Sequence, residues 1–214
     1  MNSANRCIIY VDGFNLYHGA LKGTVHKWLD LQHLFELVRP VDEIIAIRYF
    51  TALIAGPTAS HQRRYLEALA TRPLVQVRLG RFKMKEVKCG VRACTHDQSR
   101  LFQRPEEKHT DVNIALAMLD DAYQNSCDKM VLVSGDSDLV PAVHMVRDRF
   151  PRLHVTVYVP ARNHVRGAAV ELRNAANASR ILPNDLIRKA QLPPQVSDAS
   201  GRIIEKPAAW STAY

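Results

Sequence analysis

The sequence predicts an α/β protein, a three-layer α/β/α sandwich around a mainly parallel sheet of five or six strands. Short β-branched runs alternate along the chain with longer segments in which apolar residues recur at helical spacing. Right-handed crossovers convert this order into helices on both faces of a parallel sheet. Two of the β-branched runs are followed directly by acidic turns, as expected at the carboxyl edge of such a sheet.

The first part of the chain predicts three strands and three helices. Clusters of β-branched residues indicate strands at 8–11, 44–50 and 75–79, and helical spacing indicates helices at 15–22, 31–38 and 61–71. Asn15 is expected to cap the first helix and Gly23 to end it. Pro40 then separates the second helix from the second strand.

A basic stretch interrupts this alternation at about residues 80–108. It has little apolar periodicity, so we expect an irregular insertion. Eight cations fall between positions 78 and 104, more than solubility alone requires, although they could also form only a solvated surface. The candidates for contact with nucleic acid are Arg81, Lys83, Lys85, Lys88 and Arg92.

The second part of the chain resumes the alternation. Thr110 is a good N-cap for an apolar helix that reaches Ala122, and strands follow at 130–133 and 155–159. Further helices are expected at 139–150, 165–176 and 184–190. These elements form one domain over residues 1–192. After two prolines the composition turns to Ser, Ala and Gly, so residues 193–214 are expected to form a flexible C-terminal tail.

The four cysteines fall into two pairs. Cys7 and Cys127 lie beside strand candidates and are expected in the core. Cys89, Cys94 and His96 lie in the basic stretch with the spacing of zinc ligands, but a fourth ligand is not evident unless His109 or a carboxylate supplies it. The alternative is a pair of reduced thiols packed in a loop.

Charge and hydropathy constrain the partners. Lys and Arg number 29 against 21 acids, a net charge of +8, which favours a polyanionic partner such as nucleic acid. The sequence shows neither a secretory leader nor an apolar run of membrane-spanning length. We therefore expect a cytoplasmic protein without a membrane partner.

Three separated acidic segments contain the candidate site: Asp12, Asp111, and the pair Asp136 and Asp138. At one sheet edge these carboxylates would repel one another unless a divalent cation neutralised them, and oxygen ligands suit Mg²⁺ or Mn²⁺. Each acid alone also fits a helix cap or a helix dipole. One cap needs only one side chain, however, and the segment at 134–138 offers two acids and two hydroxyls.

Three motifs together resemble the NYN domain of PIN-like nucleases, with the LabA-like bacterial branch the most similar; they lie at 9–16, 107–112 and 133–139. The resemblance spans about residues 6–160 and implies a PIN-like Rossmannoid fold with a Mg²⁺- or Mn²⁺-dependent ribonuclease site. Asp12, Asp111, Asp136 and Asp138 match the catalytic and metal-binding acids, and Asn15 and Ser134 the polar positions. The Cys-containing insertion also resembles that of this branch. One departure concerns the second metal: a single acid, Asp111, stands where some relatives of the wider fold have two.

The resemblance implies hydrolysis of phosphodiester bonds in single-stranded RNA by an attacking water molecule. Lys108 and the arginines of the insertion would hold neighbouring phosphates. Four aromatic residues could stack on bases or belong to the core: Tyr10, Phe14, Tyr17 and Phe82. Exposed strand edges could also pair two copies into a homodimer.

Alternative functions differ in the residues they require. A haloacid-dehalogenase-like phosphatase needs a second acid where Phe14 stands, and a dinucleotide-binding fold needs Gly-x-Gly-x-x-Gly where the chain has Gly13 alone. The sequence does not separate a nuclease from a catalytically inert regulator that keeps the fold and binds RNA or a protein.

Overall fold

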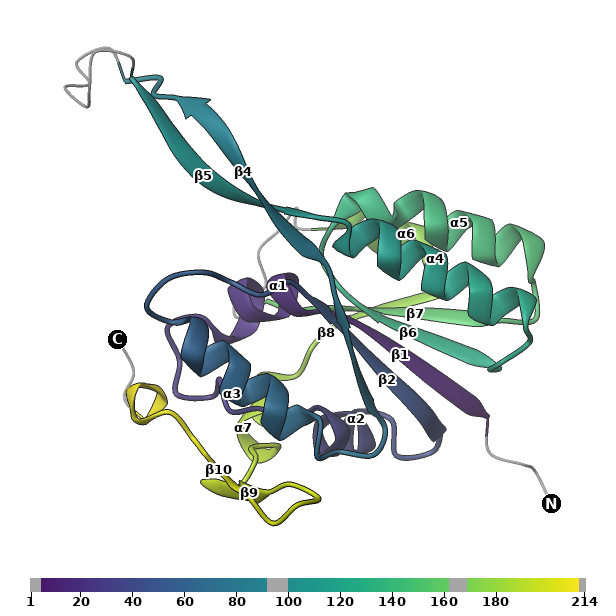
Figure 1. The fold of residues 1–214 in the computed structure, drawn as a ribbon. Helices are drawn as coiled ribbons and strands as arrows, with labels where there is room; N and C mark the ends of the chain where they lie inside the picture. The colour runs from purple at the N-terminus through teal and green to yellow at the C-terminus, as the bar shows by residue number, and fades with distance from the viewer. Residues whose placement is uncertain (1–4, 92–99, 162–168, 212–214) are drawn as a thin grey trace.

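The structure, a computed structural model, describes residues 5–91, 100–161 and 169–211, apart from the side chains of residues 104–106. Its centre is a six-stranded sheet in the order β3-β2-β1-β6-β7-β8, in which every neighbouring pair is parallel (Figure 1). The strands are β1 Arg6–Asp12, β2 Glu43–Thr51, β3 Val75–Leu79, β6 Lys129–Val133, β7 His154–Val159 and β8 Ala178–Ile181. The expected parallel sheet is confirmed, and β8 is an additional strand at its edge.

Helices cover both faces of the sheet (Figure 1). One layer contains α4 Thr110–Tyr123, α5 Val140–Arg149 and α6 Val170–Ala175. The other contains α1 Gly13–Leu16, η1 Tyr17–Leu21, α2 Leu31–Val38, α3 Ala59–Leu69 and α7 Asn184–Lys189. None of the described helices is both long enough and apolar enough to span a membrane.

Each face of the sheet contributes to its own hydrophobic core. In β1, Ile8 and Tyr10 pack beneath the α4 layer, whereas Cys7, Ile9 and Val11 pack beneath the other. All five side chains are at most 2% exposed, which explains why β1 reads as a continuous apolar run. Cys127 is likewise fully buried, so the expected core positions of both cysteines are confirmed.

The basic stretch is a β-hairpin rather than an irregular insertion. β4 Arg81–Lys88 pairs antiparallel with β5 Leu101–Lys108, and the two strands project from the body of the domain as an arm (Figure 1). Most of the described arm side chains are exposed. The sequence expectation was wrong because a hairpin without a buried face lacks the apolar alternation by which strands are recognised.

The segment after position 193 also has structure. β9 Gln195–Ser197 pairs antiparallel with β10 Ile203–Glu205, and η3 Ala208–Trp210 follows. Val196 and Ile204 are buried, and β10 lies against α3. The segment expected to be a tail is therefore a small hairpin packed on the domain, held by the burial of Val196 and Ile204 and by Trp210, which packs against Trp28 and Tyr65.

Two helix starts differ from the sequence expectation. Asp12, not Asn15, is the N-cap of α1: its Oδ1 accepts a hydrogen bond of 3.0 Å from the backbone N of Asn15. α4 begins at Thr110 after His109, whose φ of 78° is left-handed. The Thr110 hydroxyl does not cap the helix and instead donates to Glu107.

Candidate active site at the carboxyl edge of the sheet

The acidic segments at the ends of β1 and β6 meet because these strands are parallel neighbours with Val11 opposite Val133. Ser134, which follows β6, donates a hydrogen bond of 2.9 Å from Oγ to Oδ2 of Asp12. Asn15 donates to the same oxygen from Nδ2 at 2.7 Å. Asp12 is only 3% exposed; this burial raises the pKa of its carboxyl group, and the hydrogen bonds from Asn15 and Ser134 oppose the rise.

The loop after β6 is fixed to the same residues. The backbone N of Asp136 donates to Oγ of Ser134 at 3.0 Å, and the backbone N of Gly135 donates to Oδ1 of Asn15 at 3.1 Å. Asp136 caps the short helix η2 Ser137–Leu139 by accepting from the backbone N of Asp138 at 3.0 Å. Capping occupies one carboxylate of this loop and leaves the exposed Asp138 available for another role.

Asp111 brings the remaining acidic segment to this edge. It lies half-buried in the first turn of α4. Burial raises its pKa to about 6, and repulsion from Asp12, Asp136 and Asp138 contributes to the rise. The structure therefore places the four aspartates of the three motifs close enough to act on one another electrostatically.

A fifth acid belongs to the same cluster. Glu107 lies near the end of β5, and its pKa is raised to about 7, first by burial and then by Asp12 and Asp111, against the hydrogen bond from Thr110. Sequence reasoning did not include Glu107 among the site acids. The available signal was the position of Glu107, four residues before Asp111. The hairpin places Glu107 near Asp111. Glu107 therefore supplies a second acid at the place where the sequence indicated Asp111 alone.

The five acids suit a divalent cation in donor chemistry, since all offer carboxylate oxygens, and in charge, since their mutual repulsion would be relieved by one. Within residues 5–91, 100–161 and 169–211, no three His, Cys, Asp or Glu side chains are grouped so that they could hold a metal ion. Both Asp12 oxygens already accept hydrogen bonds. The fit to Mg²⁺ or Mn²⁺ thus rests on charge and ligand type, not on a preformed coordination shell.

The arm divides the expected RNA-binding residues between two faces. Side chains alternate along a strand, so Arg81, Lys83 and Lys85 share one face, and Lys108 joins them because it lies opposite Arg81. Lys88 points to the other face. These five cations are exposed. Arg92 lies outside the described residues.

The expected zinc ligands are only partly described. Cys89 follows β4 and is half-buried, and its backbone N donates to the carbonyl oxygen of Arg100 at 2.8 Å. Cys94 and His96 lie outside the described residues, so zinc binding in the arm stays a prediction.

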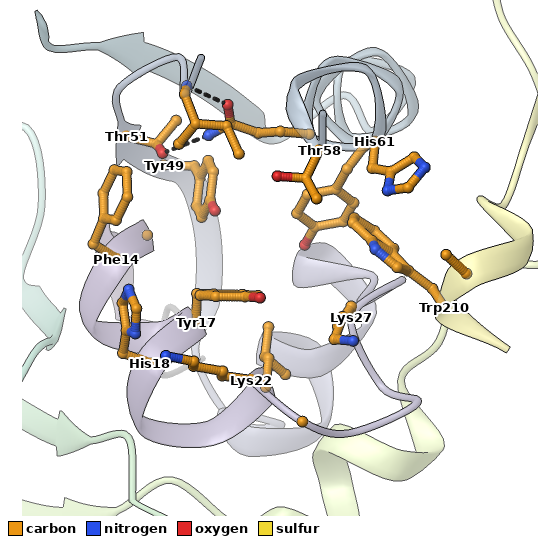
Figure 2. Close-up of a pocket in the computed structure, with 17 residues that line it drawn as sticks. Phe14, Tyr17, His18, Lys22, Lys27, Tyr49, Thr51, Thr58, His61 and Trp210 are labelled. Atoms are coloured by element: carbon orange, nitrogen blue, oxygen red, sulfur yellow. Dashed lines mark hydrogen bonds between the residues drawn. The ribbon is translucent and has the colours of Figure 1, made fainter. Parts of the chain in front are cut away.

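A pocket of about 770 Å³ opens beside the acidic edge (Figure 2). Gly13 and Phe14, which directly follow Asp12, line it together with Tyr17. Phe82 of the arm packs edge-on against Phe14, with ring centroids 5.6 Å apart. Tyr10, in contrast, is fully buried in the core and cannot stack on a base. Sequence reasoning missed this pocket because residues far apart in the chain form it.

Comparisons with known proteins agree with the fold. A 6-hydroxy-3-succinoylpyridine 3-monooxygenase of Pseudomonas putida is 31% identical to this chain, and the alignment covers 96% of the chain and 75% of that protein. A protein of unknown function from Vibrio parahaemolyticus, known from its crystal structure, is 17% identical with a TM-score of 0.53, over 86% of this chain and 97% of the other. At that identity the likeness concerns the fold alone.

The model of the NYN domain family matches residues 6–182, which include every strand of the main sheet and all five acids of the site. The match does not specify a branch, so the LabA-like assignment stays a prediction. The chain belongs to the NYN domain family, and so to the PIN-like nuclease superfamily.

Proposed function

We propose that the protein is a Mg²⁺- or Mn²⁺-dependent ribonuclease that hydrolyses phosphodiester bonds of single-stranded RNA at the acidic edge. The observation that carries the proposal is the mutual repulsion of Asp12, Glu107, Asp111, Asp136 and Asp138 at one sheet edge. Such an edge attracts cations, whereas the net charge of +8 attracts a polyanion. A cation-dependent reaction on a polyanion uses both properties.

The acids divide by exposure. Asp111, Asp136 and Asp138 are half-buried or exposed and would hold the cation, while Asp12, fixed by Asn15 and Ser134, would complete its surroundings. When bound, the cation supplies positive charge for the scissile phosphate and lowers the pKa of water. Glu107, which lies near Asp12 and Asp111, would accept a proton from the attacking water molecule.

The arm supports a preference for a nucleic-acid strand. Arg81 begins β4 and Lys108 ends β5, so the base of the arm carries cations adjacent in sequence to Glu107 and Asp111, although Glu107, which pairs with Phe82, lies on the opposite face of the arm. Its cations would bind successive phosphates along the strand, and Phe14 and Tyr17 would offer ring surfaces to unpaired bases. Unpaired bases are available in single-stranded RNA and not in a duplex.

The test is cleavage of labelled single-stranded RNA in Mn²⁺, Mg²⁺ or EDTA by the wild type and by Asp136→Asn. We expect metal-dependent cleavage that falls at least about 100-fold in the variant, because oriented charge at the reacting phosphate is lost. Asp185→Asn is the control, since Asp185 is an exposed acid in the first turn of α7, outside the acidic edge. RNA binding without cleavage in either metal would instead support a catalytically inert regulator.

A second candidate is a monooxygenase acting on a small heteroaromatic compound. One observation favours it: the Pseudomonas putida relative, 31% identical, is named for that activity on 6-hydroxy-3-succinoylpyridine. Uptake of dioxygen with NADH, measured with and without 6-hydroxy-3-succinoylpyridine, tests this candidate. Dioxygen uptake that depends on the pyridine compound would support the monooxygenase. If no such uptake occurs, the ribonuclease is the remaining candidate.

A further inference from the structure

The pocket beside the acidic edge is lined by residues of α1, η1 and α3 and by Ala209 and Trp210 of η3 (Figure 2). Its volume of about 770 Å³ falls within the usual range for small-molecule sites. Five aromatic side chains line it: Phe14, Tyr17, Tyr49, Tyr65 and Trp210. The lining therefore favours a ligand with a flat, apolar ring.

Contacts among these rings fix the walls. Trp210 and Tyr65 have centroids 5.9 Å apart, and Tyr65 and Tyr49 have centroids 6.3 Å apart, both pairs meeting edge to face. The Tyr65 hydroxyl donates to the carbonyl oxygen of Leu29 at 2.9 Å. A Cβ atom on Gly13 would lie 2.7 Å from the Tyr49 ring, so glycine is what allows the first turn of α1 to approach this wall. The cavity is therefore built into the packing of the domain.

The polar groups of the pocket are positive or neutral. Lys27, which is only 8% exposed, lines it together with Lys22, His18 and His61. Partial burial and the charge of Lys22 lower the pKa of His18. Among the described lining residues none is Asp or Glu. The lining thus favours a negative charge, in contrast to the acidic edge next to it.

We infer that this pocket binds a planar aromatic ring that carries an anionic group, with the ring between Tyr17 and Trp210 and the anion toward Lys27 and Lys22. Two sources share this chemistry: a nucleotide, as at an RNA end, and a free heteroaromatic acid. The inference goes beyond the proposed ribonuclease because it assigns an anionic aromatic ligand to the whole pocket and does not depend on the acidic edge being catalytic.

The test is isothermal titration calorimetry of the full chain with uridine 5′-monophosphate and with pyridine-3-carboxylate. Uridine and pyridine-3-carboxamide serve as the neutral analogues. At least one of the two anions should bind saturably, and its neutral analogue should bind at least about ten-fold more weakly. Lys27→Met should lower the affinity for the anion by a similar factor. Lys189→Met, which removes an exposed cation on α7, should leave this affinity unchanged.

The two anions distinguish the sources. Preference for uridine 5′-monophosphate assigns the pocket to a nucleotide, and preference for pyridine-3-carboxylate assigns it to a free heteroaromatic acid. Saturation by neither anion at millimolar concentration, or equal affinity for charged and neutral partners, would overturn the inference. If circular dichroism shows that Lys27→Met is unfolded, the exposed Lys22→Met replaces it, with the same expectation and the same contradicting result. Asp136→Asn should keep ring binding, so the inference and the ribonuclease proposal can fail independently.

Discussion

The hydroxyl of Ser134 donates a 2.9 Å hydrogen bond to Oδ2 of Asp12 across 122 residues of sequence. The same Ser134 oxygen accepts from the backbone N of Asp136 at 3.0 Å. One hydroxyl therefore joins the end of β1 to the loop after β6 and sets how the two acidic segments lie. The parallel pairing of these central strands brings it into place.

Ser134→Ala should destabilise the domain and reduce cleavage. The substitution leaves the buried Asp12 carboxylate with one donor fewer, which should lower the free energy of unfolding by about 1–3 kcal/mol. Urea unfolding measures the change. Ser137→Ala is the matched control because Ser137 is exposed in the same loop. An equal effect of both substitutions would show that the hydrogen bond does not matter.

The acidic edge should make stability depend on pH. The pKa of Asp111 is raised from 3.8 to about 6 and that of Glu107 from 4.5 to about 7. Between about pH 4 and pH 7 the folded protein therefore holds more protons on these groups than the unfolded chain. Their contribution to the free energy of unfolding falls as pH rises through this window. Glu107→Gln should remove the contribution of Glu107 to this pH dependence of the free energy of unfolding, as measured by urea unfolding in EDTA.

Added Mg²⁺ should stabilise the folded protein more at about pH 8 than at about pH 5, because the cation requires deprotonated carboxylates. Thermal unfolding with Mg²⁺ or EDTA at the two pH values measures this difference. The same Mg²⁺ effect at both pH values, or the same pH profile for wild type and Glu107→Gln, would contradict the electrostatic description of the edge.

The arm should bind RNA with one face. Lys83→Ala should weaken binding of single-stranded RNA and reduce the slope of log affinity against log salt by about 0.7, the value for one lost phosphate contact. Lys88→Ala removes a cation of the same strand from the opposite face and should have a smaller effect. Fluorescence anisotropy over a range of KCl concentrations compares the two. Equal losses would argue against a one-sided contact.

One buried acid outside the acidic edge should be purely structural. Asp121, 2% exposed, accepts from Arg48 Nη2 at 2.5 Å and from the Tyr10 hydroxyl at 2.6 Å. Asp121→Ala would leave Arg48 without its ion-pair partner and should cost about 3–5 kcal/mol, whereas Tyr10→Phe should cost about 1 kcal/mol. Chemical unfolding checks both, with the exposed Asp120→Ala as control. A loss below about 1 kcal/mol for Asp121→Ala would contradict this role.

The sheet was predictable where burial dictates the residue type. β1, β6 and β7 are buried on both faces and appear in the sequence as β-branched runs. β8 is short and only partly buried, and the arm has no buried face, so neither produces a recognisable pattern. The C-terminal hairpin was missed because its contacts with α3 join residues far apart in sequence.

The part of the candidate site that depends on the parallel sheet was also predictable. Asp12 and Asp136 follow strands that the apolar pattern identifies, and parallel pairing then brings them to one edge. The position of Glu107 depends on the β4–β5 hairpin, and the pocket depends on η3, neither of which the sequence indicates. The hydrogen bonds through Ser134 and Asn15 required coordinates, since spacing alone favoured Asn15 as a cap.

The most direct test of the central claim is a crystal structure of the protein with Mn²⁺, located by its anomalous scattering. We predict a manganese peak at the carboxyl edge, within coordination distance of oxygens of Asp111 and of Asp136 or Asp138, and the loss of that peak in Asp136→Asn. A manganese ion bound elsewhere, or carboxylates that bind none at saturating Mn²⁺, would contradict it.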